Sequence, residues 1–280
     1  MEFTNTLTQA SETTKGRGLK AGSVLKVTGK IWFITAVISQ WIFASYVLVF
    51  YGGSAAQGNL KAWAEVLPHG IISGDTMGNF ALAMHLALAV VILFLGPMQF
   101  VSSLRVKIPT LHRWGGRIYL ATAVFAAISG FYLIWTRGTS GGLIMRFGTS
   151  FNAVLILLFS YLVLKYALRS RFDTHNQWAL RLFIAVGGVW FFRVGLMFWI
   201  VINQGPVGFD PETFRGPFLD FWTFGQYLLP LAVVELYFLA QRKTNALGKY
   251  AVAAIVILST LVVGIGTFVA TLGMWLPRMI

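Results

Sequence analysis

MGNFALAMHLALAVVILFLGPMQFV, residues 77–101, is the clearest membrane-spanning stretch of the chain. It is long enough to cross a bilayer as one helix, which takes about 20 apolar residues at ~1.5 Å each. Its only ionisable side chain is His85. The stretch therefore predicts a transmembrane helix with a single ionisable group in its interior.

Six other stretches have the same length and character. Of all residues, 57% are hydrophobic and 11% are charged, whereas soluble globular domains carry about 25% charged residues. We therefore predict an all-α, polytopic transmembrane bundle in which residues 31–280 form a seven-helix domain. Residues 1–30 are polar and basic, lack the apolar segment of a signal peptide, and are expected to form a tail at the membrane surface. The predicted spans are residues 31–51, 77–101, 111–135, 143–166, 178–202, 218–239 and 251–276.

Lysine and arginine alternate between rich and poor connections. The tail and the connections after the second, fourth and sixth predicted spans are rich in them, and the other connections hold one or two each. Because basic residues accumulate on the cytoplasmic side of a membrane, the N-terminus is predicted to be cytoplasmic and the C-terminus outside. The net charge of +13 is thereby assigned to topology and to anionic lipid. The bilayer is the expected partner, and nucleic acid is not.

The sequence lacks the residues or motifs that several kinds of functional site require. There is no cysteine, which excludes disulfides, thiolate metal sites and iron–sulfur clusters. No glycine-rich phosphate loop, hydrolase motif or acid-rich metal cluster occurs, so no metal site is expected. The last predicted span has no lysine that could hold retinal. A transporter would favour a pair of broken helices or an inverted repeat, and neither is recognised.

Two ionisable residues are predicted inside the outer half of the membrane. At ~1.5 Å per residue, His85 lies about 12 Å deep in the second span and Arg193 about 14 Å deep in the fifth. A charge at mid-bilayer costs about 2.5–3.5 kcal/mol or more, and arginine does not lose its proton. Arg193 either ties helices together through neutral partners such as Asn152 and Gln226, or lines a pocket with His85. Such a pocket would bind an anion or a carbonyl-bearing ligand.

A second group is predicted near the cytoplasmic ends of the spans. Residues 111–119 and 175–181 each contain a histidine, a tryptophan within three residues of it, and an arginine five or six residues after it. Glu235 is the only acid well inside a span, and we expect it to form an ion pair with Arg181 or to relay protons. In an unbroken fifth span, His175 and Arg193 would share one helix face. The predicted inner group is His112, Arg117, His175, Arg181 and Glu235.

Haem b is an alternative use of the inner group. Two histidines at matched depth on different helices, here His112 and His175, are what a six-coordinate haem iron requires, and Arg117 and Arg181 could neutralise the propionates. Against this, both histidines stand at helix ends, where they could instead bond to the preceding loop. The outer layer offers His85 alone within a span. Absorption spectroscopy would decide between haem, another ligand and a structural role.

Part of the chain resembles a known family. The patterns HRxxGRxY at residues 112–119 and HxxWxxR at residues 175–181, with Arg193 beyond them, are similar to the bacterial predicted membrane protein family called domain of unknown function 2306. The resemblance covers roughly residues 80–240 and departs from the family at Ala179, where methionine is expected. It implies a multi-pass protein of the bacterial inner membrane and brings no assigned activity.

The sequence thus favours a multi-pass membrane protein with a small-ligand pocket between the second and fifth spans. The ligand would be hydrophobic or anionic. A haem-dependent electron-transfer protein, working with quinone, is the competing interpretation. Whether the protein is an enzyme stays open.

Overall fold

A computed structural model describes residues 20–67, 69–243 and 245–280. Within these ranges the chain is almost entirely helical and contains no β-strand, only one isolated bridge between Asp210 and Arg215. In chain order the elements are α2 (Ala21–Val47), the π-helical turn η1 (Leu48–Gly52), α3 (Gly53–Ala56), the 3₁₀ helix η2 (Leu60–Glu65), α4 (Thr76–Met98), α5 (Ser102–Lys107), α6 (Pro109–Thr136), α7 (Gly142–Leu168), α8 (Phe172–Val186), α9 (Gly188–Ile202), α10 (Pro217–Lys243), α11 (Ala246–Ala270), the π-helical turn η3 (Thr271–Trp275) and the 3₁₀ turn η4 (Leu276–Arg278).

The predicted all-α membrane fold is confirmed. Among the described residues, six continuous helices are long and apolar enough to cross a bilayer, and a pair of helices makes a seventh candidate. The first span begins at Ala21, so residues 21–30, assigned above to the tail, form the first turns of α2. The remainder of the predicted tail, residues 1–19, lies outside the described residues.

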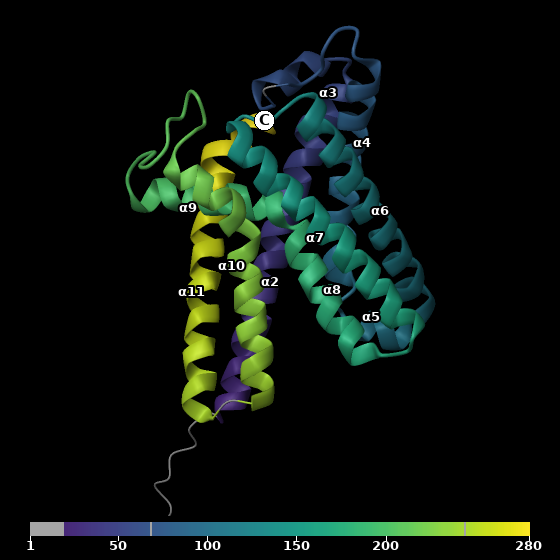
Figure 1. Cartoon of the computed structure of the whole chain (residues 1–280), viewed down its shortest axis with the longest axis vertical. Helices are drawn as coiled ribbons and strands as arrows, with labels where there is room; N and C mark the ends of the chain where they lie inside the picture. Colours follow the sequence, from purple (N-terminus) through teal and green to yellow (C-terminus); the bar gives the residue numbers. More distant parts are fainter. Residues whose placement is uncertain (1–19, 68, 244) are drawn as a thin grey trace, which may run out of the picture.

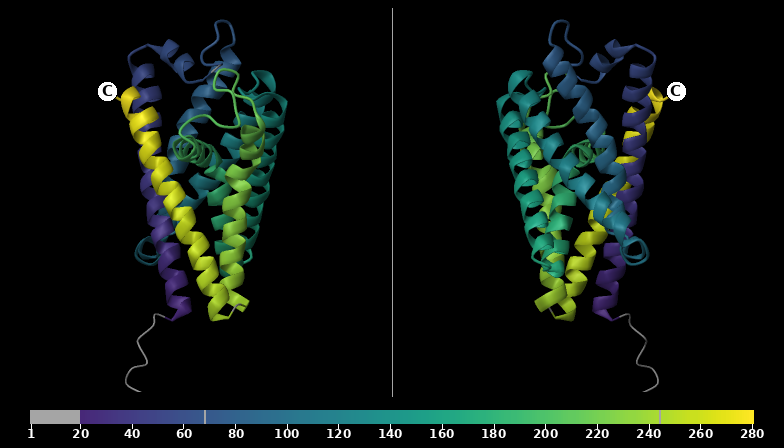
Figure 2. Two further views of the ribbon diagram at one scale, coloured as in Figure 1. Left: turned by 90° about the vertical axis from the view of Figure 1, so that its left-hand side faces the viewer. Right: turned by 90° about the vertical axis from the view of Figure 1, so that its right-hand side faces the viewer.

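The fifth predicted span, residues 178–202, is not one straight helix. It divides at Gly187 into α8 and α9, whose axes are bent by 57°. Figure 1 shows α9 running across the long axes of α10 and α11, and Figure 2 shows α9 almost along its own axis. The expectation that the chain has no broken helix pair is therefore wrong.

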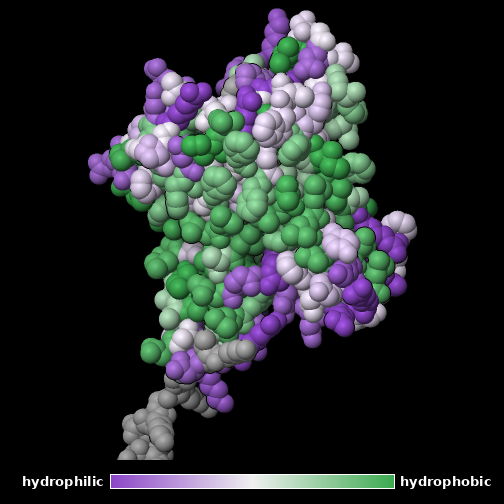
Figure 3. Space-filling model, viewed as in Figure 1, coloured by the Kyte–Doolittle hydropathy of each residue, from purple (hydrophilic) through white to green (hydrophobic). Residues whose placement is uncertain are grey.

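The spans form two groups, which α9 links and which also contact each other directly through α2 with α4 and through α10 with α7 and α8 (Figure 1). In one group α2 packs against α11, and α10 contacts α11; in the other, α4 packs on α6, α6 on α7, and α7 on α8. Helix α9 leaves the second group at Gly187 and packs against α11 and α10 of the first. On the face shown in Figure 3, a hydrophobic band crosses the middle of the molecule, and hydrophilic residues gather toward its ends.

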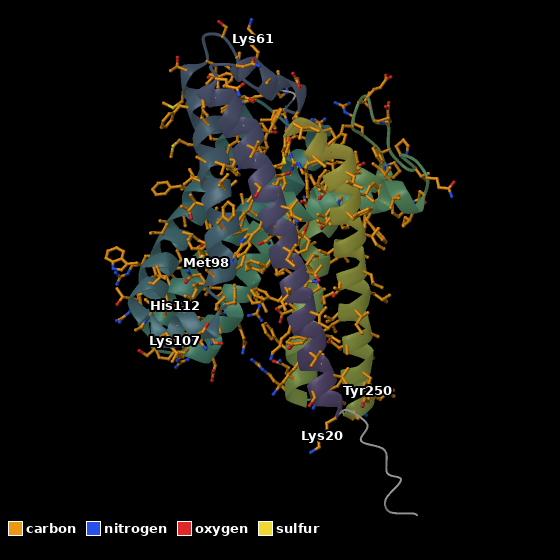
Figure 4. The ribbon with its side chains drawn as sticks, turned by 180° about the vertical axis from the view of Figure 1, so that it is seen from behind. Lys20, Lys61, Met98, Lys107, His112 and Tyr250 are labelled. Atoms are coloured by element: carbon orange, nitrogen blue, oxygen red, sulfur yellow. The ribbon has the colours of Figure 1, made fainter. Side chains whose placement is uncertain are left out.

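The positions of labelled lysines identify the two ends of the bundle. In Figure 4 Lys61 lies at the end that carries η2, and Lys20 and Tyr250 lie at the opposite end. Lys107 and His112 lie toward the same end as Lys20. We call the end with Lys61 the outer end and the end with Lys20 the inner end, following the topology predicted from charge, which itself stays a prediction.

The break between α8 and α9 depends on glycine and on a buried amide. A helix that ends inside a membrane leaves backbone carbonyls that only protein can satisfy. The Nδ2 of Asn152, on α7, donates to the carbonyl of Ala185 at 3.0 Å. A Cβ on Gly188 would lie 2.7 Å from this Nδ2, so only glycine leaves room for the amide. The glycine pair thus permits the bend, and Asn152 compensates for it.

A chain of hydrogen bonds fixes α9 against its neighbours. The Nε1 of Trp190 donates to the Oγ of Ser39 at 2.7 Å, and this hydroxyl lies 2.5 Å from the Oγ1 of Thr267. Thr267 in turn donates to the carbonyl of Val263 at 2.6 Å. Every donor in the chain has an acceptor, as buried polar groups require. α9 is therefore bonded to α2, and through Ser39 to α11.

One arginine holds the loop that precedes α4. Arg137 forms an ion pair with Asp75 at 2.7 Å and also donates to the carbonyls of His69 and Gly70 and to the Oδ1 of Asn79. The Arg137 side chain is 5% exposed and that of Asp75 is 36% exposed. Asp75 also caps α4 by accepting from the Gly78 amide at 2.9 Å. The guanidinium thus links the end of α6 to the loop that precedes α4.

The crossing of α9 and α11 predicts a position-specific effect of alanine. A Cβ on Gly266 would lie 2.2 Å from the carbonyl oxygen of Val194, whereas nothing lies within 4 Å of a Cβ on Gly264. Gly266→Ala should lower the melting temperature, because overpacking costs about 1–3 kcal/mol. Gly264→Ala should leave it unchanged or raise it, because alanine favours helix. Thermal unfolding of the two variants in the same detergent tests this, and equal melting temperatures would contradict the crossing.

The arginine-linked outer loop should be sensitive to the charge of Asp75. The Gly78 amide and the Arg137 guanidinium hold the pKa of the Asp75 carboxyl below its usual value. A depressed pKa means that the contribution to stability is present above the ordinary carboxyl range and is lost as pH falls through the depressed value. Asp75→Asn keeps the helix cap and removes the charge, so trypsin should cut faster at Lys61 at neutral pH. Asp210→Asn, in the other long outer loop, is the control; equal rates in both variants would refute the link.

Candidate functional site

His85 is bound to a neighbouring span. Its Nδ1 donates to the carbonyl of Ala126 at 3.0 Å and lies 3.1 Å from the Oγ of Ser129, both on α6. A Cβ on Gly130 would be 3.0 Å from the imidazole Cε1. The small residue of α6 therefore provides the space for the ring. These contacts make His85 a cross-link between α4 and α6.

Arg193 lies elsewhere, beside α2. Its guanidinium carbon is 5.4 Å from the centre of the Phe43 ring, and its Nη1 is 3.5 Å from the Val189 carbonyl. Within the described ranges it forms no ion pair. The expected pairing with His85 is thus not found, because the bend at Gly187 directs α9 toward α2 and α11. For the same reason the depth of Arg193 counted along a straight helix does not apply, and His175 and Arg193 do not share one helix face.

The two neutral partners expected for Arg193 also lie elsewhere. Asn152 donates to Ala185 at the helix break, and Gln226 donates to the Thr223 carbonyl at 3.0 Å within α10. The oxygen of Gln226 lies 3.7 Å from the Cβ position of Gly188. Both amides thus lie close to the break between α8 and α9. The guanidinium of Arg193 instead lies over the ring of Phe43.

The two arginines of the predicted inner group, Arg117 and Arg181, contact different side chains. Arg181 forms a bidentate ion pair with Glu235, with Nε–Oε1 at 2.6 Å and Nη2–Oε2 at 2.8 Å. Its guanidinium also lies 4.4 Å from the ring centre of Trp178. Arg117 repeats only this last contact, 4.9 Å over Trp114. The similar sequence segments therefore produce the same stacking of arginine on the tryptophan three residues before it, a cation–π contact.

The two inner histidines are near each other. His112 and His175 lie close enough to interact electrostatically. The Nδ1 of His175 donates to the Val163 carbonyl at 3.0 Å, whereas the Nδ1 of His112 is buried without a partner among the described residues. The carboxamide of Gln99 fills the space beside α6, 2.7 Å from the Cβ position of Gly115. Neither of the two cavities described below is lined by either histidine.

The largest cavity described lies on the inner side of α9. Its volume is about 980 Å³, and its walls come mainly from α2, α9, α10 and α11. The α2 residues that line it lie between Lys26 and Ile34, on the N-terminal side of Ser39, where α9 is bonded to α2. The walls are almost wholly apolar. They include Phe33, Phe191, Phe198, Trp222, Val233 and Val262.

The inner end of this cavity is polar and basic. Lys26 and Lys30 of α2 line it there, with Tyr237 of α10. A second cavity of about 560 Å³ shares Phe100, Leu180 and Tyr237 with the first, so the two adjoin. Polar residues line the second cavity: Asp173, Asn176, Gln177, Gln241 and Arg242.

Hydropathy alone did not reveal the cavity. Lys26 and Lys30 were assigned to the tail, and the aromatic residues of α9 and α10 were counted only as parts of spans. A usable signal was present in the Gly187–Gly188 pair, which lies in the middle of an apolar stretch. Glycine pairs are a common cause of sharp helix bends.

Comparisons with known proteins give one match. Residues 82–209 match the model of a family described as "Predicted membrane protein (DUF2306)". The matched region extends from α4 to the loop after α9. The comparisons with curated proteins and with solved structures found no match. Residues 82–209 of this membrane protein are therefore similar to the family of predicted membrane proteins called domain of unknown function 2306.

Proposed function

We propose that the protein binds an amphipathic small molecule within the bilayer. Its apolar body would occupy the cavity on the inner side of α9, and its anionic head group would lie at Lys26 and Lys30. The observation that carries this proposal is the cavity itself, about 980 Å³ of apolar space with two lysines at one end. The pocket expected between the second and fifth spans is thus proposed at a different place.

The size and lining of the cavity support a ligand. Small-molecule pockets typically measure about 300–1,000 Å³, are mainly apolar and aromatic, and carry a few polar groups that set orientation. Here the polar side chains are Lys26, Lys30, Ser259 and the hydroxyl of Tyr237. An elongated molecule would lie along the spans with its polar end toward the inner surface.

Charge supports an anionic head group. No acid lines the large cavity, and the adjoining one has one acid, Asp173, against the cation of Arg242. Lysine ammonium groups bind phosphate and carboxylate as point charges. The broken helix above the cavity is a further likeness to ligand-binding membrane proteins, in which irregular backbone at membrane depth lines a binding site.

Haem is less well supported. A bis-histidine iron needs an open slot for the macrocycle between its two imidazoles. Gln99 instead packs on Gly115 beside His112, and both cavities lie away from the histidines. The residues present do not fit the group, and we derive no electron-transfer step from it.

Filling the cavity should weaken ligand binding. The probe is 9,10-dibromostearate, whose bromines quench tryptophan fluorescence when the chain lies beside Trp32, Trp199 or Trp222 in the cavity wall. Val233→Phe combined with Val262→Phe should reduce saturable quenching in detergent-solubilised protein, because both side chains line the cavity. The matched control is Leu236→Phe with Leu261→Phe, on the same helices at exposed positions, 40% and 53% exposed. Equal quenching in both proteins would contradict the proposal.

The lysines provide a second variant that leaves the packing intact. Lys26→Gln with Lys30→Gln should weaken binding of the same probe about 1.4- to fivefold per lysine, since exposed ion pairs contribute about 0.2–1 kcal/mol. Lys20→Gln with Lys249→Gln removes the same charge at the inner end without touching the cavity. If the two double variants bind alike, the head group is not held at Lys26 and Lys30.

Absorption spectroscopy separates the two proposals. Protein purified after expression in haem-supplemented cells should show no Soret band, because the Gln99 carboxamide packs against α6 beside His112 and leaves the iron without that face. A Soret band that is lost in His112→Ala and His175→Ala, but kept in His69→Ala, would overturn this expectation and establish haem.

A further inference from the structure

The outer side of α9 faces a cluster of buried polar atoms that lack partners outside it. The Nε1 of Trp275 is buried without a hydrogen-bond partner in the described part of the chain, and the buried hydroxyls of Tyr46 and Tyr51 lie beside each other with no described partner outside this pair. Tyr46, Tyr51 and Trp275 are 1%, 4% and 0% exposed. An unsatisfied buried donor costs about 1–3 kcal/mol, so the Trp275 indole N–H and the hydroxyl hydrogen that the tyrosine pair leaves unused require an explanation.

These three groups lie together. The rings of Tyr46 and Tyr51 meet edge to face with centroids 6.0 Å apart, and Tyr46 stacks on Trp275 at 6.3 Å. Phe43 closes the group, 5.2 Å from Trp275. Because η3 packs against α2, donors from the two ends of the chain meet at one place.

Two arginines lie near the same hydroxyls. Arg193 and Arg278 are within electrostatic range of Tyr46 and Tyr51. Arg193 stands over Phe43, and Arg278 is exposed and bonded to the Met274 carbonyl at 2.6 Å. Neither arginine forms an ion pair with a described residue. The cluster therefore combines unused donors with uncompensated positive charge.

The backbone around the cluster is also irregular. Tyr51 lies in the π-helical turn η1, and Trp275 ends the π-helical turn η3. π-Helical turns are rare and occur frequently at functional sites. Their presence on both α2 and the end of α11 accounts for how the two side chains reach the same space.

We propose that Tyr46, Tyr51, Trp275 and Arg193 form a binding site for a small carboxylate with an apolar body. A carboxylate accepts several hydrogen bonds and pairs well with a guanidinium. A single negative charge is favoured over a doubly charged phosphate, because desolvating charge in an aromatic enclosure is costly. Arg278 would attract the anion from the outer surface. This site is on the opposite side of α9 from the cavity and does not rest on the function proposed for it.

The test uses benzoate as the probe and benzyl alcohol as its neutral counterpart, with the full chain in lipid nanodiscs at constant ionic strength. Benzoate should raise the melting temperature of the wild type, and benzyl alcohol should not. Tyr51→Phe should weaken benzoate binding about tenfold or more, because a hydrogen bond to a charged group is lost. Arg193→Gln should abolish the response.

Tyr119→Phe is the matched control. The Tyr119 hydroxyl is buried without a partner in the described chain, but it lies on α6, where its ring packs at Gly96. Tyr→Phe nearly preserves the volume at either position, so both variants should fold without benzoate. The proposal is overturned if benzoate and benzyl alcohol act alike, or if Tyr51→Phe and Tyr119→Phe bind benzoate equally; water would then satisfy the hydroxyls.

Discussion

A helix that breaks inside a membrane must satisfy its freed backbone groups with protein atoms, and this constraint organises the molecule. The side-chain amide of Asn152 donates a hydrogen bond to the freed carbonyl of Ala185, and the absence of a side chain at Gly188 leaves room for this amide. Hydrocarbon offers no other partner. The bend that results sends α9 across the bundle, and the hydrogen bonds through Trp190, Ser39 and Thr267 hold it there.

The direction of α9 explains why this protein has two different faces at mid-membrane. On its inner side, aromatic residues and the lower part of α2 enclose a large apolar space that ends at Lys26 and Lys30. On its outer side, Arg193 faces Phe43 and the tyrosines of α2. If residues 178–202 formed one straight helix, α9 would not cross the bundle. Neither the apolar cavity on its inner side nor the contact of Arg193 with Phe43 on its outer side would then form. The proposed ligand chemistries, one amphipathic and one small and anionic, follow from that division.

The spans could be predicted because hydropathy and the positions of lysine and arginine act locally along the chain. The ion pair of Arg181 with Glu235 was expected for a similar reason: a carboxylate inside a span needs a cation at its own depth. The break could not be predicted from Gly188 alone, because a glycine inside an apolar span does not show that its partner at the bend, Asn152, lies on α7. His85 was matched to Arg193 by depth alone, and depth does not reveal that its Nδ1 donates to the Ala126 carbonyl and lies beside the Ser129 hydroxyl on the adjacent helix. Tyr46, Tyr51 and Trp275 have no local spacing to connect them, because they come from opposite ends of the sequence.

The membrane depth of the residues of α9 tests most directly whether this helix lies across the bundle. The chain has no cysteine, so single cysteines at Val189, Phe192, Trp199, Val201 and Ile202 can carry spin labels without background. Collision rates with oxygen and with a water-soluble nickel chelate then give the depth of each label in nanodiscs. A transverse α9 predicts depths that oscillate with the helical period and show no steady trend from Val189 to Ile202. A steady change of about 1.5 Å per residue, as in a straight span, would contradict it.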